Sequence, residues 1–253
     1  MTGHKTPSTG AAPGTGELVM AGVTAGYHSH DIVLEDVSMR VVPGRVTVVL
    51  GPNGSGKSTT LRVLTGFLKQ RSGSVTLDGA DIRSLDPGER LKAGIALLPQ
   101  GRSVFPQLSV TDNLRLGGWL LRGDRSALSD AVEGMFDRYP TLKPLCSRPA
   151  GSLSGGQARL LEFARTLLTA PRVLLIDEPS VGLSPALVDV VYDEIARLKD
   201  EGRTILLVDQ NVQAAVGLAD DVYTLAYGRN HLSGARDGFE GQLDDLIKQW
   251  LSL

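Results

Sequence analysis

The chain has 253 residues, and its 26 lysines and arginines nearly balance its 28 aspartates and glutamates, which leaves a net charge of −2. This balance gives no support to a broad nucleic-acid-binding surface, so no nucleic-acid partner is expected. The length allows one α/β domain, with or without a smaller subdomain. The single cysteine, Cys146, excludes an internal disulfide bond and favours a reducing compartment.

No stretch of about 18 or more consecutive apolar residues occurs, so no segment is expected to span a bilayer. Residues 1–16 are rich in Thr, Gly, Ser and Pro and lack the apolar segment of a signal peptide. This composition predicts a disordered tail. Any association with a membrane is therefore expected to come through a partner protein.

Strand patterns alternate with short helical ones in the first hundred residues. Apolar runs and alternation predict strands at residues 18–23, 32–42, 46–50 and 95–98, and a strand and turn at residues 74–79. A helix is expected from the glycine-rich turn after residue 50 to about residue 68. Pro87, at a first-turn position, predicts a short helix that opens at residue 86.

The spacing of apolar residues changes from about residue 109. Between residues 109 and 168, apolar residues recur at helical spacings without a β-branched run, which predicts a helical subdomain inserted into the α/β framework. Unbroken apolar runs then predict buried strands at residues 173–177 and 204–208, separated by a helix over residues 185–199. This order favours a mostly parallel sheet with ligand chemistry at the carboxyl ends of its strands.

The C-terminal segment has apolar residues at i, i+3, i+4, i+7 and i+8, namely Leu243, Leu246, Ile247, Trp250 and Leu251. The spacing predicts an amphipathic helix. Packing against its own domain is the favoured role, and a subunit contact is the alternative.

Residues 51–58 fit the pattern G-x-x-x-x-G-K-[ST], between an apolar strand and a predicted helix. Glycines let backbone N–H groups converge on phosphate oxygens, and a helix N-terminus favours anions. Lys57 can reach the outer phosphates, and the Ser58 hydroxyl can ligate Mg²⁺. The stretch predicts a nucleoside triphosphate site that contains Gly51, Pro52, Asn53, Gly54, Ser55, Gly56, Lys57, Ser58 and Thr59.

Two acidic residues follow the apolar run that starts at residue 173. An acidic group that closes a buried strand is costly unless it meets a cation or hydrogen-bond donors, so Asp177 is predicted to coordinate Mg²⁺, directly or through water. The next residue, Glu178, points in a different direction from Asp177 and can orient or deprotonate an attacking water. Together with the phosphate-binding loop, the pair predicts a hydrolytic site.

A second glycine-rich stretch, Leu-Ser-Gly-Gly-Gln at residues 153–157, opens a predicted helix. Ser154 and the N–H groups of Gly155 and Gly156 are therefore expected to form a second anion site at a helix N-terminus. One chain with two phosphate-directed loops suggests that the second loop, which includes Gln157, serves the nucleotide of another subunit.

Together these motifs resemble the ATP-binding subunits of ABC transporters, over nearly the whole chain beyond residue 17. Residues 51–58 are similar to the Walker A motif and residues 153–157 to the signature sequence, and Asp177 and Glu178 resemble the Walker B aspartate and catalytic glutamate. The resemblance implies a P-loop NTPase (RecA-like) α/β core with an N-terminal antiparallel β subdomain and an inserted helical subdomain.

The resemblance also extends the expected ATP and Mg²⁺ site. Gln100 is similar to the Q-loop glutamine, which implies contact with ATP and adds Gln100 to Ser58 and Asp177 as a metal ligand. Tyr27 is similar to the A-loop aromatic that stacks on adenine.

The implied assembly is a head-to-tail dimer, homomeric or heteromeric, with ATP between one subunit's Walker A motif and the other's signature. ATP closes the dimer and hydrolysis reopens it, which drives separate transmembrane permease subunits. The chain is accordingly expected in the cytoplasm, held to the inner face of the cell membrane by the permeases. Val104, Phe105 and Leu108 would help to form the groove for a permease helix, and an ordinary core role is the alternative.

A finer resemblance, carried by residues 98–110, 177–185 and 205–211, is to branched-chain amino-acid importers, with Asp209 where Glu is common. Urea importer subunits share much of this pattern. The prediction is an ATPase that energises an importer for branched-chain or related amino acids, which depends indirectly on a solute-binding protein.

Two residues depart from the family pattern. Gln210 stands where most ABC ATPases carry a switch histidine, and its amide can hydrogen-bond a γ-phosphate or position water without becoming cationic. Glu178 is then the main water-activating group. Ser184 stands where the D-loop of many ABC proteins has Asp. These departures motivate the alternative of a nucleotide-binding, weakly hydrolytic partner in an unequal heterodimer.

Overall fold

The structure is a computed structural model that describes residues 16–239. Nearly all of the predicted N-terminal tail, and the predicted C-terminal helix with Trp250, lie outside the described residues. Within the described part of the chain, no helix has the length and apolar character needed to cross a membrane.

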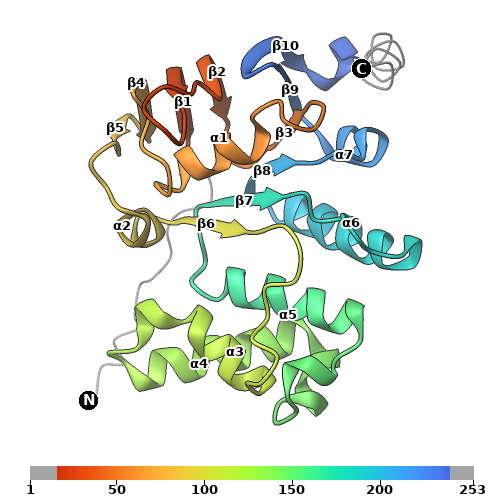
Figure 1. Cartoon of the computed structure of the whole chain (residues 1–253). Coiled ribbons are helices and arrows are strands. Elements are labelled where there is room, and N and C mark those ends of the chain that lie inside the picture. Colours follow the sequence, from red (N-terminus) through yellow and green to blue (C-terminus); the bar gives the residue numbers. More distant parts are fainter. Residues whose placement is uncertain (1–15, 240–253) are drawn as a thin grey trace, which may run out of the picture.

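An antiparallel sheet forms the N-terminal part of the molecule (Figure 1). Its strands lie in the order β2-β1-β4-β5, with bounds β1 (Leu18–Ala25), β2 (Leu34–Val41), β4 (Ser72–Leu77) and β5 (Ala80–Asp81). Buried and less buried residues alternate along much of β1 and β2, as in a sheet with one covered face. This is the antiparallel subdomain that the family resemblance implies.

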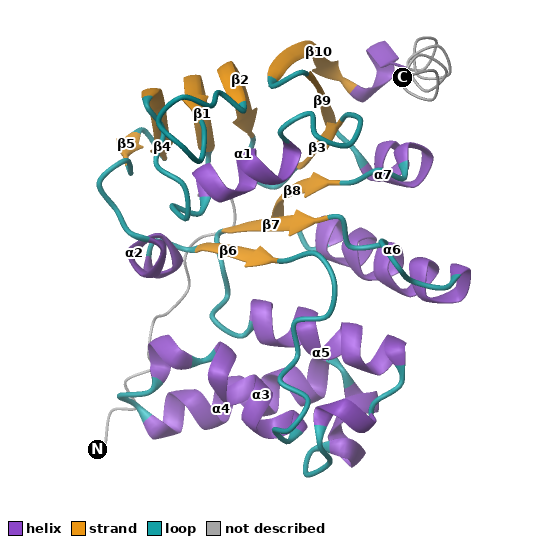
Figure 2. Ribbon diagram, viewed as in Figure 1, coloured by secondary structure: helices purple, strands orange, loops and turns teal. Residues whose placement is uncertain are grey.

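A six-stranded sheet forms the centre of the molecule (Figure 2). Its order is β10-β9-β3-β8-β7-β6, with bounds β3 (Val46–Leu50), β6 (Ile95–Leu98), β7 (Val173–Asp177), β8 (Thr204–Val208), β9 (Asp221–Ala226) and β10 (Arg229–Ala235). Every pairing is parallel except that of β9 with β10. The predicted mostly parallel sheet is therefore confirmed.

The four strands β3, β8, β7 and β6 lie side by side and end together. In the strand register Val49 is opposite Val208, Val208 is opposite Asp177, and Ile176 is opposite Leu98. Because parallel strands point the same way, the four loops that follow them meet at one edge of the sheet. These loops carry the phosphate-binding stretch, the switch position, the paired acids and the Q-loop position.

The central sheet is buried on both faces. Side chains such as Val48, Ile176 and Leu207 pack toward the helical insert and the helices of the second half of the chain. Val49, Leu175 and other side chains of opposite orientation pack with the antiparallel sheet and the helix after the glycine-rich turn. Strands covered on both sides read as unbroken apolar runs, which explains the sequence pattern.

Within residues 16–239, four helices belong to the α/β part: α1 (Lys57–Leu64), α2 (Pro87–Lys92), α6 (Pro185–Asp200) and α7 (Val212–Leu218). The insert contains α3 (Val110–Gly117), α4 (Arg125–Arg138) and α5 (Gly155–Leu167), with 3-10 turns at Trp119–Leu121, Pro140–Leu145 and Ala150–Ser152; a fourth 3-10 turn, Arg236–Phe239, follows β10. In Figure 1, α5 runs between the sheet and the other helices of the insert.

Several predicted boundaries need correction, among them the strand expected from residue 74, which begins at Ser72 as β4. The first helix was expected to reach residue 68, but α1 ends at Leu64, because Gly66 has a φ of 80°, in the left-handed region where a helix cannot continue. The first strand runs two residues further than predicted, to Ala25, and the second begins two residues later, at Leu34. Ends of elements depend on local hydrogen bonds more than on apolar periodicity.

Candidate functional site

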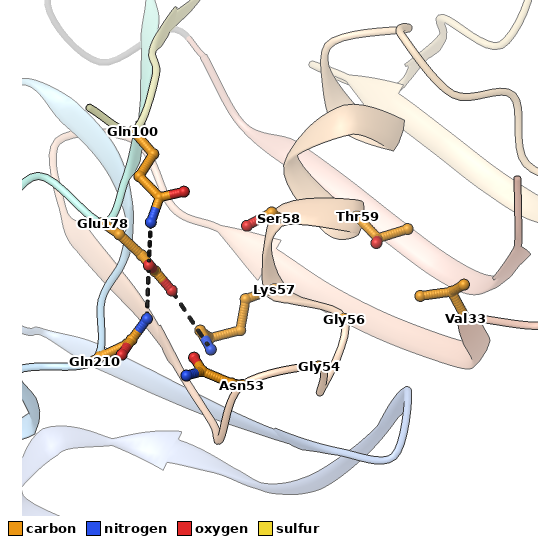
Figure 3. Close-up of a pocket in the computed structure, with 10 residues that line it drawn as sticks. All are labelled: Val33, Asn53, Gly54, Gly56, Lys57, Ser58, Thr59, Gln100, Glu178 and Gln210. Atoms are coloured by element: carbon orange, nitrogen blue, oxygen red, sulfur yellow. Dashed lines mark hydrogen bonds and ion pairs between the residues drawn. The ribbon is translucent and has the colours of Figure 1, made fainter. Parts of the chain in front are cut away.

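A cavity of about 380 Å³ opens at the carboxyl ends of the central strands. Ten residues line it: Val33, Asn53, Gly54, Gly56, Lys57, Ser58, Thr59, Gln100, Glu178 and Gln210 (Figure 3). All but Val33 are among the predicted site residues. Segments far apart in the sequence therefore meet around one space.

The start of α1 forms one wall of the cavity. No side chain caps this helix, and its N-cap residue, Gly56, has a φ of 103°. The first N–H groups of any helix lack partners inside the helix, so those of α1 are available to an anion. Gly51, Pro52 and Ser55 shape the loop behind the wall, where Ser55 N–H donates to the Pro52 carbonyl at 3.2 Å.

Lys57 lies at the centre of the site and is only 4% exposed. Its Nζ donates to the carbonyls of Gly51 at 2.8 Å and Pro52 at 3.0 Å, and it lies 3.7 Å from Glu178 Oε1. Burial lowers the pKa of Lys57, while the nearby Glu178 carboxylate works in the opposite direction. A phosphate group in the cavity would give this amine the counter-charge and the oxygen acceptors that it needs.

Glu178 is held from three directions. The Nε2 atoms of Gln100 and Gln210 both donate to its Oε2 at 2.7 Å, and Lys57 faces its Oε1. Its backbone has a φ of 39°, and its N–H donates to the Val208 carbonyl at 2.8 Å. Figure 3 shows the three side chains converging on the carboxylate. A carboxylate fixed in this way beside an anion site is in position to orient or deprotonate a water.

Asp177 lies next to Ser58, whose hydroxyl donates to Asp177 Oδ1 at 3.2 Å. Burial raises the pKa of this aspartate, so its charged form is disfavoured without a cation. Among residues 16–239, no group of three or more His, Cys, Asp and Glu side chains could hold a metal ion. One carboxylate and one hydroxyl fit the way Mg²⁺ binds in phosphate sites, with substrate phosphates and waters as its other ligands.

Tyr27 does not line the cavity, but its hydroxyl lies 3.3 Å from Thr59 Oγ1, which does. Its side chain is 47% exposed, and the Arg62 guanidinium lies 5.7 Å from the ring centroid. An exposed ring at the rim is free to stack on a flat ligand. The sequence reasoning missed Val33, whose only signal was its place between Tyr27 and the second strand.

The predicted second anion site lies outside this cavity. Ser154 caps α5: its hydroxyl accepts from the Gln157 N–H at 3.3 Å, and the Gln157 side chain accepts from the Ser154 N–H at 3.1 Å. Ser154 is exposed, with Gly155 and Gly156 behind it in the first turn. None of the four residues lines the cavity, so the structure does not bring the two glycine-rich stretches of one chain together.

The family model described as "ABC transporter" matches residues 34–181 of the chain. A relative from Archaeoglobus fulgidus, named as a probable branched-chain amino acid transport ATP-binding protein LivF, is 40% identical over 84% of this chain and 89% of its own length. The high-affinity branched-chain amino acid transport ATP-binding protein BraG of Pseudomonas aeruginosa is 36% identical over 80% of this chain and 86% of its own.

An exporter component and a solved structure complete the comparison. The lipopolysaccharide export system ATP-binding protein LptB of Escherichia coli is 35% identical over 78% of this chain and 81% of its own length. The crystal structure of an ATP-binding cassette of an ABC transporter in its ADP conformation has a TM-score of 0.82 and 29% identity, and covers 94% of this chain and 99% of that one.

Proposed function

Because the chain belongs to the ABC transporter ATP-binding family, we propose that it energises a membrane importer for branched-chain or related amino acids. The chain is an ATP-binding subunit of a transporter, with an ATPase activity that is coupled to transport. The proposed solute is supported by the similarity to LivF and BraG, whose names assign them to branched-chain amino acid transport.

The residues that converge on the cavity supply the proposed hydrolytic site. Lys57 and the bare start of α1 bind the phosphates, and Tyr27 stacks on the adenine. Glu178 activates water, and Gln210 senses the γ-phosphate. In this proposal the incoming phosphates draw Lys57 and the two amides toward themselves and so release Glu178 for catalysis.

Mg²⁺ would be held by Ser58, Asp177 and Gln100, and when bound it would neutralise phosphate charge. Because Nε2 of Gln100 donates to Glu178, its Oε1 is the atom left to accept or to ligate. The raised pKa of Asp177 supports this assignment, since a cation beside the buried carboxylate would favour its charged form.

The position of Ser154 supports a dimer. A capped helix start on the surface, away from its own chain's cavity, suits the nucleotide of a second ATP-binding subunit, with Gly155, Gly156 and Gln157 around it. Ser184 is the N-cap residue of α6, and its hydroxyl, which is not used to cap the helix, is assigned to the same interface. The assembled transporter would hold the chain at the inner face of the cell membrane.

The surface that faces the permeases is proposed to include Phe105 and Leu108. Phe105 is 51% exposed and Leu108 36% exposed, whereas Val104 packs against the core. The Arg165 guanidinium lies 5.4 Å from the centroid of the Phe105 ring and supports it from one side. A charged substitution of Phe105 should therefore uncouple transport while ATP binding persists; intact transport would remove this surface from the proposal.

The test is ATP-dependent uptake in proteoliposomes that contain this chain with its permease subunits and their solute-binding protein. Labelled leucine should accumulate with the native chain and not with Glu178→Gln, which should still bind ATP. Uptake of urea instead of leucine would replace the cargo, and equal turnover in the native and Glu178→Gln assemblies would favour the weakly hydrolytic partner.

An export ATPase is the second candidate, because LptB matches at 35% identity over 78% of the chain. The same vesicles distinguish the two directions. Accumulation of solute on the side away from the ATPase after it is loaded on the ATPase side would show export and overturn the importer proposal.

A further inference from the structure

Asp209 follows β8 directly and is fully buried, at 0% exposure. Four donors surround its carboxylate. Oδ1 accepts from the backbone N–H of Gln210 at 2.7 Å, from that of Asn211 at 3.0 Å and from the Ser180 hydroxyl at 3.1 Å, and Oδ2 accepts from the Tyr192 hydroxyl at 2.7 Å. These five groups form one hydrogen-bonded unit, the Asp209 cluster.

Every donor in the Asp209 cluster is neutral. No ion pair of Asp209 occurs within residues 16–239, although its charge works against the lowering of the Lys57 pKa by burial. A buried carboxylate is costly unless its oxygens are satisfied, and four hydrogen bonds meet that need. Burial raises the pKa of the Tyr192 phenol, and the adjacent Asp209 charge adds to the rise, so the tyrosine stays protonated as a donor.

The Asp209 cluster joins two backbone segments that carry proposed catalytic groups. Ser180 lies two residues after Glu178, and Gln210 is the residue after Asp209. The same two segments also meet through side chains, because the Gln210 side chain donates to Glu178 Oε2 at 2.7 Å. The amide and the carboxylate can meet only if their two backbone segments keep a fixed separation, and Asp209 bonds to both of them. Tyr192 extends the same connection to α6.

We propose that Asp209 is a positioning residue that sets the geometry of Gln210 against Glu178. The proposal rests on the catalytic roles proposed above for those two residues. Its short side chain suits the task, because an aspartate can accept from the next two backbone N–H groups and so turn the chain tightly. Asp209 does not line the cavity, and in this proposal it acts on the reaction chiefly by fixing the backbone of Gln210.

The experiment is a double-mutant cycle in the assembled transporter, with kcat, KM and ATP affinity measured for Asp209→Ala in the native and Gln210→Ala backgrounds. In the native background kcat should fall on the order of tenfold or more, the size expected for lost hydrogen bonds to a charged group. ATP affinity should stay within about twofold, and in the Gln210→Ala background the further loss should be small, because coupled residues are not additive.

Asp209→Asn is the conservative variant. Its Oδ1 can still accept from both backbone N–H groups and from Ser180, and the Tyr192 hydroxyl can turn to accept from the new amide. Turnover should therefore remain within about threefold of native, by the same hydrogen-bond accounting. Equal losses for Asn and Ala would show that geometry is not what Asp209 supplies, and would overturn the proposal.

Tyr192→Phe covers the case in which Asp209→Ala does not fold, because it removes one hydroxyl and keeps the ring. Its matched control is Tyr223→Phe, another half-buried tyrosine, whose hydroxyl accepts from the Arg40 N–H at 3.1 Å away from the site. Tyr192→Phe should lower kcat at constant ATP affinity, and the control should not. Equal kcat in the two variants would overturn the proposal.

The outcomes also separate this inference from the function that it rests on. If Gln210→Ala lowers turnover but Asp209→Ala has its full effect in both backgrounds, Asp209 acts independently and only the positioning role fails. If Gln210→Ala leaves turnover unchanged, the catalytic role of Gln210 fails, and the positioning role fails with it.

Discussion

The two glycine-rich helix starts of the chain differ in how the first N–H groups of the helix are satisfied. At α1 the N-cap is Gly56, no side chain caps the helix, and the adjoining Lys57 is 4% exposed. At α5 the N-cap is Ser154, the capping box with Gln157 is complete, and the serine is exposed. Both are helix N-termini with N–H groups that favour anions. They differ in whether the helix is finished without a ligand.

This difference indicates what each start is built to receive. The bare start of α1 leaves its first N–H groups for a phosphate, whose charge would also favour the protonated form of the buried amine beside it. The capped start of α5 is stable by itself and lends a hydroxyl to a ligand that arrives from outside. The first is therefore suited to the nucleotide of its own chain, and the second to that of a neighbour.

The strongest test of the bare start is Lys57→Ala. Turnover should fall by about 10²–10³-fold or more, the range for loss of one preorganised donor to a charged transition state. ATP binding, followed by fluorescence of a nucleotide analogue, should weaken as well. Lys69→Ala, an exposed lysine beyond α1, is the control and should behave as native. Turnover that survives in Lys57→Ala would remove the bare start from the active site.

The capped start is tested by Ser154→Ala. Loss of a hydrogen bond to a phosphate should lower turnover of the assembled transporter by about 10–100-fold, from a contribution of about 1.5–3 kcal/mol. ATP affinity of the isolated subunit should not change, because Ser154 lies outside its own cavity.

A matched control for that variant is Ser152→Ala, which removes an exposed hydroxyl that donates to the Pro149 carbonyl at 2.8 Å. Both turnover and affinity should stay native there. Weaker ATP binding by the isolated Ser154→Ala subunit would contradict the comparison, since it would place both helix starts on one nucleotide.

The glycines of the two starts should differ in stability. Gly56 has a φ of 103°, and an added Cβ would lie 2.5 Å from Leu34 Cδ2. A residue with a side chain costs roughly 1–2 kcal/mol in the left-handed region, before any overlap. Gly155 is helical, and its Cβ would meet only the flexible end of Leu187, at 2.7 Å. Urea unfolding should show the larger loss for Gly56→Ala; a larger loss for Gly155→Ala would reverse the ranking.

The smallest effect is expected for Asp177→Asn, which should stabilise the nucleotide-free protein. Because burial raises the pKa of Asp177 above its ordinary value of 3.8, the native state disfavours the charged form. The resulting loss of stability is present at neutral pH and disappears as pH falls through the raised pKa toward 3.8. The variant's advantage should follow the same course.

Thermal midpoints at several pH values measure this effect, and each kcal/mol corresponds to about 2–4 °C in a chain of this size. Asp130→Asn, at an exposed acid on α4, is the control and should not shift the midpoint. An Asp177→Asn midpoint below the native one at neutral pH would mean that the carboxylate is satisfied without a cation.

Much of the site could be read from the chain because it consists of local motifs. The glycine and lysine spacing of residues 51–58, the apolar run before Asp177, and Ser154 with Gln157 three residues later each specify a backbone geometry over a few residues. The structure places a strand, a turn and a helix around the first of these, and a capping box at the last. Short-range chemistry of this kind is written in consecutive residues.

Asp209 and Tyr192 could not be found in this way. Nothing in the residues near either of them indicates that they share a hydrogen bond, because they come from a loop and a helix 17 positions apart. Val33 was missed for the same reason. Its place in the cavity depends on how the antiparallel sheet packs against α1, which no periodicity of its own segment records.

The amino-acid sequence alone determined the motifs, the approximate elements and the mostly parallel sheet, since each follows from spacing and apolar pattern within a short window. Only the tertiary structure decided the order of the strands, in which β8 lies between β3 and β7. That order places the end of β8, which Gln210 follows, between the ends of β3 and β7, so that the Glu178 carboxylate meets two amides and a lysine. Strand order depends on contacts between residues distant in the chain, such as Val46 with Ile205, and the local pattern of each strand reads the same in any order.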